Sequence, residues 1–432
     1  MSFEIVTKWL TATSDLRVSE IDATLAQVLI KIGNKFVTEF RDDKHDSSKH
    51  IEIPTYSVAE WIAENWWSLL WEPRKSEDDE PTPDFLSRHG FLSAQHGFAL
   101  PKLLIVPIGR SMQVSAAARN VPLADVRFLH GGLEYLPREP VERELRQFVS
   151  GVVSRLNEHR IKDTYLQDAW QLVSDTTPEE EQFCRFVGAL GRSPYDVDEK
   201  TASLIERLLP TLGEQLLMDL CLASPAHSFQ AAAAVAEQAV SLTKDATTST
   251  LSPLESIFAP KDNANVPAYR RGVRAAELLR TRLGIKDLDP SGATRIFELL
   301  KVDTARRIEV PKNQDDILIT GAVVRDESEM KVALLQSTEA KRRFSGARAI
   351  FSAWSADHPN EHRLLTSAVT RDQQANRAFA AELTAPRNLI RTKARRNRLT
   401  QSDVYDLASD LQIGPDVVKK QALNNGIVVA PM

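Results

Sequence analysis

The sequence predicts an α+β protein with a strand-rich N-terminal domain, a helical middle region and a mainly helical C-terminal domain that holds a small sheet. At 432 residues the chain is too long for one ordinary core, so two or three domains are expected. Its 42% hydrophobic and 26% charged residues are typical of a folded protein. Near position 140 the apolar residues change from short runs to a helical repeat.

The N-terminal domain, residues 1–139, is predicted from apolar runs that are separated by turn residues. Gly33-Asn34 lies between two such runs in 23–40, a pattern typical of a hairpin turn. Further strands are predicted over 102–108 and 112–118. The sequence does not indicate what this domain does.

A tryptophan-rich stretch over 58–71 has helical spacing. Core packing is favoured for its tryptophans over stacking on a sugar or a base, because apolar residues complete the same surface. The four tryptophans of this stretch are Trp61, Trp66, Trp67 and Trp71. The acidic, proline-containing stretch 72–83 predicts an exposed loop. His89 and His96 have no carboxylate or thiol companion in the pattern, so both are interpreted as structural.

The helical middle region, residues 140–243, shows apolar residues at i, i+3, i+4 and i+7. Helices are predicted over 141–156, 165–173, 178–190, 199–223 and 229–242. Thr177 is a good cap for the third helix, whose first turn carries three glutamates. Residues 244–267 are rich in Thr, Ser, Asp, Asn and Pro and predict a linker.

The C-terminal domain, residues 268–432, is predicted to combine helices with two strands. The strands are expected over 317–324 and 330–335, separated by a polar turn. The helices are expected over 269–283, 293–300, 343–354, 371–383 and 401–411, with a shorter one near 415–423.

Charge and cysteine content exclude several classes of protein. The net charge of −5 provides no global attraction to nucleic acid or to an anionic membrane. Cys184 and Cys221 lie in apolar surroundings without ligand spacing, which indicates reduced, buried thiols in a cytoplasmic protein. Neither a signal peptide nor a membrane span is predicted. No nucleotide-binding motif is present, so no cofactor is expected.

One C-terminal motif is specific enough to suggest a family. Residues 374–386 have the sequence Gln-Ala-Asn-Arg-Ala-Phe-Ala-Ala-Glu-Leu-Thr-Ala-Pro, and Arg343-Phe344 opens an earlier helix. Over roughly 265–432 this pattern resembles the ImmA/IrrE family of metallopeptidase-like proteins. The resemblance implies a zincin-like C-terminal domain and a link to stress responses, mobile elements and phage-related regulation.

The resemblance also implies a zinc site, and this chain departs from it. Active members carry His-Glu-x-x-His on the first helix, where two histidines on one face bind zinc and the glutamate activates water. An acidic residue of the second helix completes the ligands. Here these positions hold Arg348, Ala349, Ser352 and Gln374. We therefore expect no catalytic residue and no metal, and Arg348 is hypothesised to fill the place of the metal.

An inverted zinc motif remains as an alternative. His358, Glu361 and His362 spell His-x-x-Glu-His, which would bind zinc if it lay on one continuous helix. Pro359 and Asn360 favour a solvated loop.

A basic segment raises the alternative of nucleic-acid binding. Six of twelve residues are basic and none is acidic: Arg387, Arg391, Lys393, Arg395, Arg396 and Arg398. With Arg343 and its basic neighbours they would form a positive face for phosphates, unless they are a solvated helix end. Residues 400–426 predict a helix-turn-helix whose second helix offers Lys419 and Lys420, unless the segment simply packs on the preceding domain.

The favoured function is therefore a non-catalytic ImmA/IrrE-like regulatory protein. It would bind a protein partner in a bacterial stress, toxin–antitoxin or phage-defence setting, a role that rests on the resemblance. The alternatives are a nucleic-acid-binding regulator and a zinc peptidase with an unorthodox site. The sequence does not indicate the oligomeric state.

Overall fold

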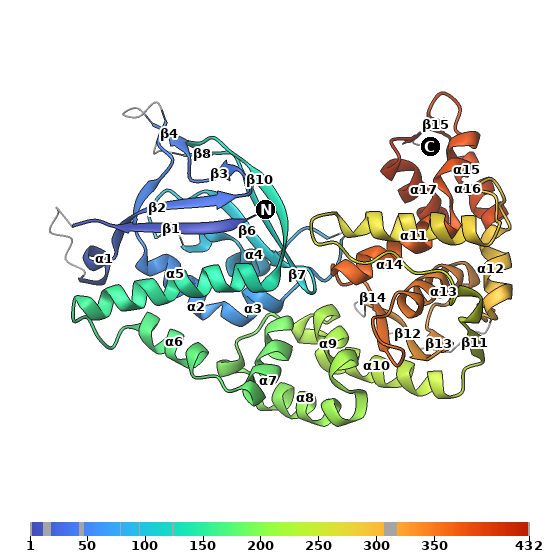
Figure 1. Ribbon diagram of the computed structural model, residues 1–432, viewed down its shortest axis with the longest axis horizontal. Coiled ribbons are helices and arrows are strands. Elements are labelled where there is room, and N and C mark those ends of the chain that lie inside the picture. The colour runs from blue at the N-terminus through green and yellow to red at the C-terminus, as the bar shows by residue number, and fades with distance from the viewer. Residues whose placement is uncertain are drawn as a thin grey trace. The chain divides into compact units, whose positions relative to one another are not determined.

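The computed structural model in Figure 1 describes residues 2–11, 19–42, 47–77, 79–94, 96–122, 125–305 and 318–430. It is 51% helical and 19% strand, with the strands in several small sheets, which confirms the α+β class. The chain divides into two compact units, Met1–Ala202 and Ser203–Met432. This division falls inside the predicted helical middle region, so its helices are shared between the units.

The first sheet of the N-terminal unit is built around β2. Strand β2 (Leu25–Ile32) pairs antiparallel with β1 (Phe3–Trp9), β3 (Lys35–Phe36) and β5 (Ile51–Pro54). The short helix α1 (Ser19–Ala23) precedes it. Gly33 has a φ of +57° between β2 and β3, which confirms the predicted hairpin.

Two smaller antiparallel sheets complete the strands of this unit. One has the order β10-β7-β6 and confirms the two strands predicted after position 100. Its members are β6 (Lys102–Pro107), β7 (Ser111–Ala117) and β10 (Gly132–Pro137). The other has the order β4-β9-β8, with β4 (Phe40–Arg41), β8 (Arg119–Val121) and β9 (Val126–Phe128).

Helices cover these sheets and bury the tryptophans. They are α2 (Tyr56–Glu64), α3 (Trp66–Trp71), α4 (Pro83–His89), α5 (Arg138–Glu158), α6 (Tyr165–Ser174) and α7 (Pro178–Ala189), with 3₁₀ turns η1 (Phe91–Ala94) and η2 (Pro194–Asp196). Trp61, Trp66 and Trp67 are at most 6% exposed, which confirms core packing for them. Thr177 caps α7 in a capping box with Glu180, as predicted.

Close helix packing in this unit requires one glycine. A Cβ on Gly188 of α7 would lie 2.6 Å from the carbonyl oxygen of Trp67 in α3. The absence of a side chain therefore lets α7 approach the tryptophan helix closely.

The helix predicted over 199–223 is two helices. Helix α8 (Glu199–Leu212) crosses the boundary between the units, and α9 (Glu214–Ala223) follows Gly213, whose φ is +78°. A positive φ is incompatible with a continuing right-handed helix, so the single-helix prediction is wrong at this point. The 3₁₀ turn η3 (Ala226–Ser228) then leads into α10 (Phe229–Lys244).

The stretch 244–267 does not behave as a linker. Strand β11 (Thr248–Thr250) pairs with β13, and the 3₁₀ turn η4 (Ser252–Leu254) follows. Leu251, Leu254 and Ile257 are buried in the core of the C-terminal unit. The linker was predicted because polar residues dominate this stretch, and its three buried apolar residues were too few to change that prediction.

The core of the C-terminal unit lies between one antiparallel sheet and its helices. The sheet has the order β11-β13-β12-β14, with β12 (Ile319–Asp326), β13 (Glu329–Leu334) and β14 (His362–Thr366). Residue 317 of the predicted strand lies outside the described residues. The helices are α11 (Ala268–Arg282), α12 (Gly292–Leu300), α13 (Glu339–Trp354) and α14 (Arg371–Thr384). A Cβ on Gly272 would overlap the Ala375 carbonyl oxygen, so this glycine allows α11 to lie directly on α14.

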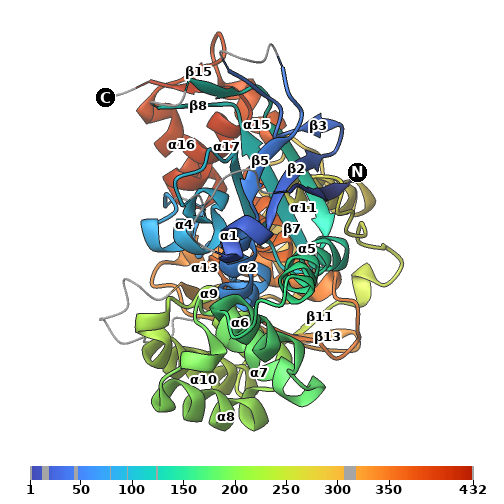
Figure 2. The same cartoon turned by 90° about the vertical axis from the view of Figure 1, so that its left-hand side faces the viewer.

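A separate helical cluster ends the chain, and both views place its three helices together (Figures 1 and 2). It contains α15 (Arg387–Lys393), α16 (Gln401–Leu411) and α17 (Pro415–Asn424), with the parallel strand pair β15 (Arg398–Leu399) and β16 (Val428–Val429). Its small core includes Val404, Leu407 and Val418.

Candidate functional site

Helices α13 and α14 lie together beside the C-terminal sheet and carry Arg348, Ala349, Ser352 and Gln374. Both helices begin at a threonine cap: Thr338 accepts a hydrogen bond from the Lys341 N–H, and Thr370 accepts one from the Gln373 N–H. Phe351 and Phe379 stack with ring centroids 4.9 Å apart and hold the helices together. The middle of α13 therefore faces the first turns of α14.

Arg348 lies between the two helices and is only 3% exposed. Its guanidinium donates hydrogen bonds to four neutral oxygens. These are Asn376 Oδ1 at 3.0 Å, Thr320 Oγ1 at 3.1 Å, Gln373 Oε1 at 2.7 Å and the Thr366 carbonyl. Such hydrogen bonds compensate a buried cation for its lost hydration. Arg348 thus joins α13 to α14 and to the ends of two strands.

The amide that meets Arg348 belongs to Gln373, one residue before the predicted Gln374. Gln373 Oε1 also accepts from the Thr366 N–H at 3.2 Å and from Asn376 Nδ2 at 3.1 Å. Its Nε2 donates to the Leu364 carbonyl at 2.8 Å. Gln374 is half-buried, and its side chain leaves the helix about 100° away from that of Gln373. Arg348 therefore contacts the residue that precedes Gln374.

The residues at the predicted zinc positions do not fit a zinc ion. Zinc requires lone pairs from imidazole, thiolate or carboxylate groups, whereas a guanidinium has only donors. Ala349 is buried in the core and Ser352 is half-buried. Across the described ranges, no group of three or more His, Cys, Asp and Glu side chains is arranged to hold a metal ion.

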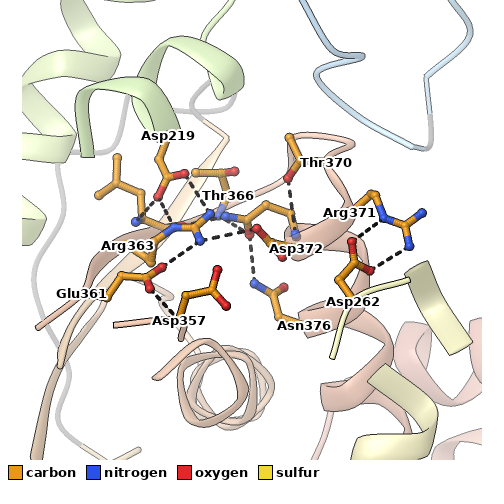
Figure 3. Close-up of polar contacts among 12 residues, drawn as sticks. Asp219, Asp262, Asp357, Glu361, Arg363, Thr366, Thr370, Arg371, Asp372 and Asn376 are labelled. Atoms are coloured by element: carbon orange, nitrogen blue, oxygen red, sulfur yellow. Dashed lines mark hydrogen bonds and ion pairs between the residues drawn. The ribbon is translucent and has the colours of Figure 1, made fainter. Parts of the chain in front are cut away.

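The inverted motif does not lie on a helix. Helix α13 ends at Trp354, and His362 is the first residue of β14. Glu361 accepts from the Asp357 N–H at 3.1 Å and pairs with Arg363 at 3.2 Å (Figure 3). The two histidines therefore do not share a helical face, and the geometric condition for this alternative is not met.

Arg363 of β14 is the centre of a second buried network, which Figure 3 shows. Asp219 of α9 accepts from its guanidinium at 2.9 and 3.1 Å and from the Leu364 N–H at 3.0 Å. Burial alone lowers the pKa of Arg363, but the nearby carboxylates of Asp219, Asp372 and Glu361 outweigh it and raise that pKa above its usual value. This ion pair joins α9 to the sheet. Its partners are 144 residues apart, so no local pattern indicated it.

Arg371, the first residue of α14, fixes the chain that precedes α11. It is 4% exposed and forms a two-bond ion pair with Asp262 at 2.8 and 2.7 Å (Figure 3). It also donates to the carbonyls of Asn263 and Val266. The second half of the predicted linker is therefore anchored to the same helix that contacts Arg348.

The predicted basic run divides into one paired residue and an exposed group. Arg387 pairs with Glu277 and lies 4.0 Å from Glu382. The exposed group consists of Arg391, Lys393, Arg395, Arg396 and Arg398. We call this group the basic turn.

The backbone concentrates three of these arginines in one tight turn. The backbones of Arg395 and Arg398 exchange two hydrogen bonds of 3.0 Å. The intervening Arg396 and Asn397 have φ values of +50° and +60°, as a two-residue hairpin turn requires. Asn397 Nδ2 donates to the Gly426 carbonyl and holds the turn against the C-terminal segment.

The helix pair α16–α17 has the predicted helix-turn-helix order. Gln412 ends α16 with a φ of +55°, and α17 begins at Pro415. Lys419 and Lys420 are exposed on α17, while Val418 is buried. The two lysines are therefore accessible.

A charged cluster in the N-terminal unit was missed by the sequence analysis. Glu72 was expected in an exposed loop, but it is 4% exposed and accepts from Arg88 at 2.7 and 2.8 Å. His89 Nε2 lies 3.1 Å from the same carboxylate, and its Nδ1 lies 2.8 Å from the Ile105 carbonyl. His89 thus has a carboxylate companion after all. Burial alone raises the pKa of Glu72, but the hydrogen bonds from His89 and Arg88 outweigh it and lower that pKa to about 2.

Both cysteines are buried, as predicted. Burial is the main cause that raises the pKa of the Cys184 thiol to about 11. A thiol with this pKa is protonated at neutral pH and is a poor nucleophile.

Comparison with known proteins assigns no relative to this chain. No protein-family model, no curated protein and no solved structure matches it. Within the described part of the chain, every helix is too short or too polar to cross a membrane.

Proposed function

We propose that this chain is a non-catalytic relative of the ImmA/IrrE-type peptidases that regulates a bacterial process by binding a protein partner in the cytoplasm. The observation that carries the proposal is the hydrogen-bonding of Arg348, a buried guanidinium at the position predicted for the first zinc ligand. Because Arg348 donates to α14 and to two strands, it holds the two helices of a zincin-like cleft in place without a metal.

Two further features support this proposal. Ala349 supplies no group that would take a proton from water. Ser352 and Gln374 are only half-buried, so the surface beside the Arg348 network remains partly accessible to a partner. The setting in stress response, toxin–antitoxin pairs or phage defence rests on the family resemblance.

The non-catalytic part of the proposal is tested by metal content and peptide hydrolysis. We expect the purified chain to cleave no peptide library and to retain no stoichiometric transition metal after dialysis. The combined variant Arg348→His, Ala349→Glu, Ser352→His, Gln373→Glu should gain one zinc per chain, because it restores a ligand set. A transition metal bound by the native chain between α13 and α14 would contradict the proposal.

The partner-binding part is tested by blocking the accessible surface. Proteins captured by the native chain from lysate of its own host should be lost with Ser352→Trp, which places a bulky side chain there. The control is Ser241→Trp at an exposed position of α10. Equal capture by both variants would argue against this surface.

Nucleic-acid binding is a second candidate, and the basic turn specifically favours it. Five exposed cations lie within eight residues, and three of them are concentrated around the Arg395–Arg398 turn. The exposed lysines of α17 belong to the same helical cluster. Cations in this density favour a phosphate backbone.

The salt dependence of binding to a duplex tests this candidate. The combined variant Arg395→Gln, Arg396→Gln, Arg398→Gln should reduce the slope of log K against log salt by about 2 to 3, since each phosphate contact contributes about 0.9. The control replaces the exposed Arg146, Arg207 and Arg295 by Gln, which removes the same charge. Equal slopes for both variants, or no binding at low salt, would remove this candidate.

A further inference from the structure

The C-terminal unit buries several arginines, and one of them differs from the rest in its hydrogen bonding. Each is between 2% and 5% exposed: Arg280, Arg342, Arg343, Arg348 and Arg371. Arg342 donates to the carbonyls of Thr304, Ala305, Gln336 and Ser337. Arg280 donates to the carbonyls of Leu383, Lys286 and Asp289. Arg280 Nε and Arg371 Nη1 have no hydrogen-bond partner among the described residues, but each of these guanidinium groups still donates to three or more acceptors of the protein.

Arg343 has the fewest hydrogen-bond acceptors of these arginines. In the described ranges, its guanidinium has one hydrogen-bond acceptor, the Thr294 hydroxyl at 2.7 Å. Its Nε is buried and has no hydrogen-bond partner among those residues. The guanidinium carbon lies 5.1 Å from the Phe297 ring centroid, a contact that leaves the N–H donors unsatisfied. Burial lowers the pKa of Arg343, and the charge of the nearby Glu339 offsets this effect only in part.

Arg343 also lines a pocket of about 380 Å³ between α13 and α16. Glu339 and Ala340 of the first turn of α13 form one wall, and Tyr405, Ala408, Ser409 and Gln412 of α16 form the other. The second wall combines a phenol, a hydroxyl and an amide, which donate hydrogen bonds to anionic oxygens. The first turn of a long helix adds a partial positive charge beside Arg343.

We infer that this pocket binds a small ligand with a carboxylate or phosphate group, which accepts from the buried Arg343 guanidinium. The anion supplies the hydrogen bonds that the chain itself does not. Tyr405, Ser409 and Gln412 contact the remainder of the ligand. This inference is independent of the Arg348 network, because the pocket lies between α13 and α16 and shares no lining residue with that network.

The exposed Glu339 provides a second test of anion binding in this pocket. It is one helical turn before Arg343 and lines the same pocket, but it forms no ion pair with Arg343 within 4.0 Å in the described structure. Its negative charge repels an entering anion. Removal of this charge should therefore strengthen anion binding, whereas removal of the Arg343 charge should abolish it.

The experiment follows the arginine Nε–H signals of the ¹⁵N-labelled full-length chain by NMR. Inorganic phosphate and acetate are titrated separately, with the ionic strength held constant by chloride. We expect one Nε–H signal to shift saturably, and this signal should be missing in Arg343→Gln. In Glu339→Gln the affinity should rise by about threefold or more, which corresponds to one weak surface charge interaction.

The outcomes separate the two ligand chemistries. A saturable shift with phosphate alone assigns a phosphate-bearing ligand, one with acetate alone assigns a carboxylate, and one with both assigns the shared anionic group. The control Arg295→Gln, an exposed arginine on the neighbouring α12, should leave the titration unchanged. The inference is overturned if no Nε–H signal shifts saturably with either anion, or if the shift persists in Arg343→Gln.

Discussion

Each compact unit buries a glutamate, and the pKa values of the two carboxyl groups move in opposite directions. Glu72 in the N-terminal unit and Glu382 in the C-terminal unit are both 4% exposed. The pKa of Glu72 is lowered to about 2, because the hydrogen bonds from His89 and Arg88 outweigh its burial. Burial raises the pKa of Glu382 to about 7, although the Arg387 N–H, the Arg280 charge and Gln421 all act to lower it. Equal burial therefore says little about ionisation until the partners are known.

The same contrast applies to the two successive sites on α13. Arg348 donates to four oxygens and joins several elements, whereas Arg343 has one hydroxyl acceptor and a buried, unsatisfied Nε. Buried charge stabilises a fold only where the protein supplies matched partners. Where the protein supplies no such partners, a buried charge destabilises the fold unless a bound ligand supplies them.

Replacing Arg348 should have the largest effect on stability. Arg348→Met removes four buried hydrogen bonds, each worth about 1 kcal/mol, and should cost about 4 kcal/mol of unfolding free energy. Trp354 is the one tryptophan after position 202, so its fluorescence during urea unfolding reports on the C-terminal unit. Ser352→Ala, on the same helix and half-buried, should change that free energy by less than about 0.5 kcal/mol. Equal midpoints for the two variants would show that the Arg348 network contributes no stability.

Neutralising Glu72 should have the next largest effect, and it should be limited to the N-terminal unit. The pKa of Glu72 is lowered from 4.5 to about 2 in the folded state, so its contribution is complete above pH 4.5 and is lost as the pH falls toward 2. Glu72→Gln should therefore cost about 3 kcal/mol at pH 7 and flatten the acid limb of stability. The control Asp84→Asn removes the exposed partner of Arg88 and should cost less than about 1 kcal/mol. Unfolding of both variants is measured between pH 2 and pH 7 by tryptophan fluorescence.

Glu382 should give a pH dependence of the opposite sign in the C-terminal unit. Its pKa is raised from 4.5 to about 7 in the folded state, so the unfolded chain loses this proton first. Stability should therefore fall as the pH rises from 4.5 to 7, and Glu382→Gln should remove this fall and add about 2 kcal/mol at pH 8. Hydrogen exchange of α14 and α17 peptides at pH 5 and pH 8 measures the difference. A Gln variant that exchanges faster than the native chain at pH 8 would contradict the assignment.

Replacing Arg343 should have the smallest effect on stability, in contrast to replacing Arg348 on the same helix. Arg343→Met removes a buried charge that is only partly compensated and should leave stability unchanged or raise it by about 1 kcal/mol in chloride buffer. The measurement is the same Trp354 unfolding curve that is used for Arg348→Met. A loss as large as that of Arg348→Met would place Arg343 among the compensated arginines.

Much of the secondary structure was predictable because it depends on neighbours in the chain. The capping box at Thr177, the hairpin at Gly33 and the apolar face of α16 all arise from interactions within a few residues. The break at Gly213 was missed because the apolar repeat continues across it, while a positive φ ends the helix. Strand β14 was missed as well, since its polar first residues resemble the preceding loop.

The Arg348 site was predictable only in part. Its location on a helix that faces α14 followed from the motif, and the exposure of the basic turn followed from composition. The choice of Gln373 in place of Gln374 depends on the rotation of α14 against α13, which no local pattern encodes. The pairs Glu72–His89 and Asp219–Arg363 join residues 17 and 144 positions apart.

Local patterns of apolar residues, caps and turns thus predicted most of the helices and some of the strands. Packing of distant segments decided which charges are buried, which partners they receive and which of them lack one. The physical reason is that helix and turn formation depend on short-range hydrogen bonds and spacing, whereas the ionisation of a buried group depends on every atom around it.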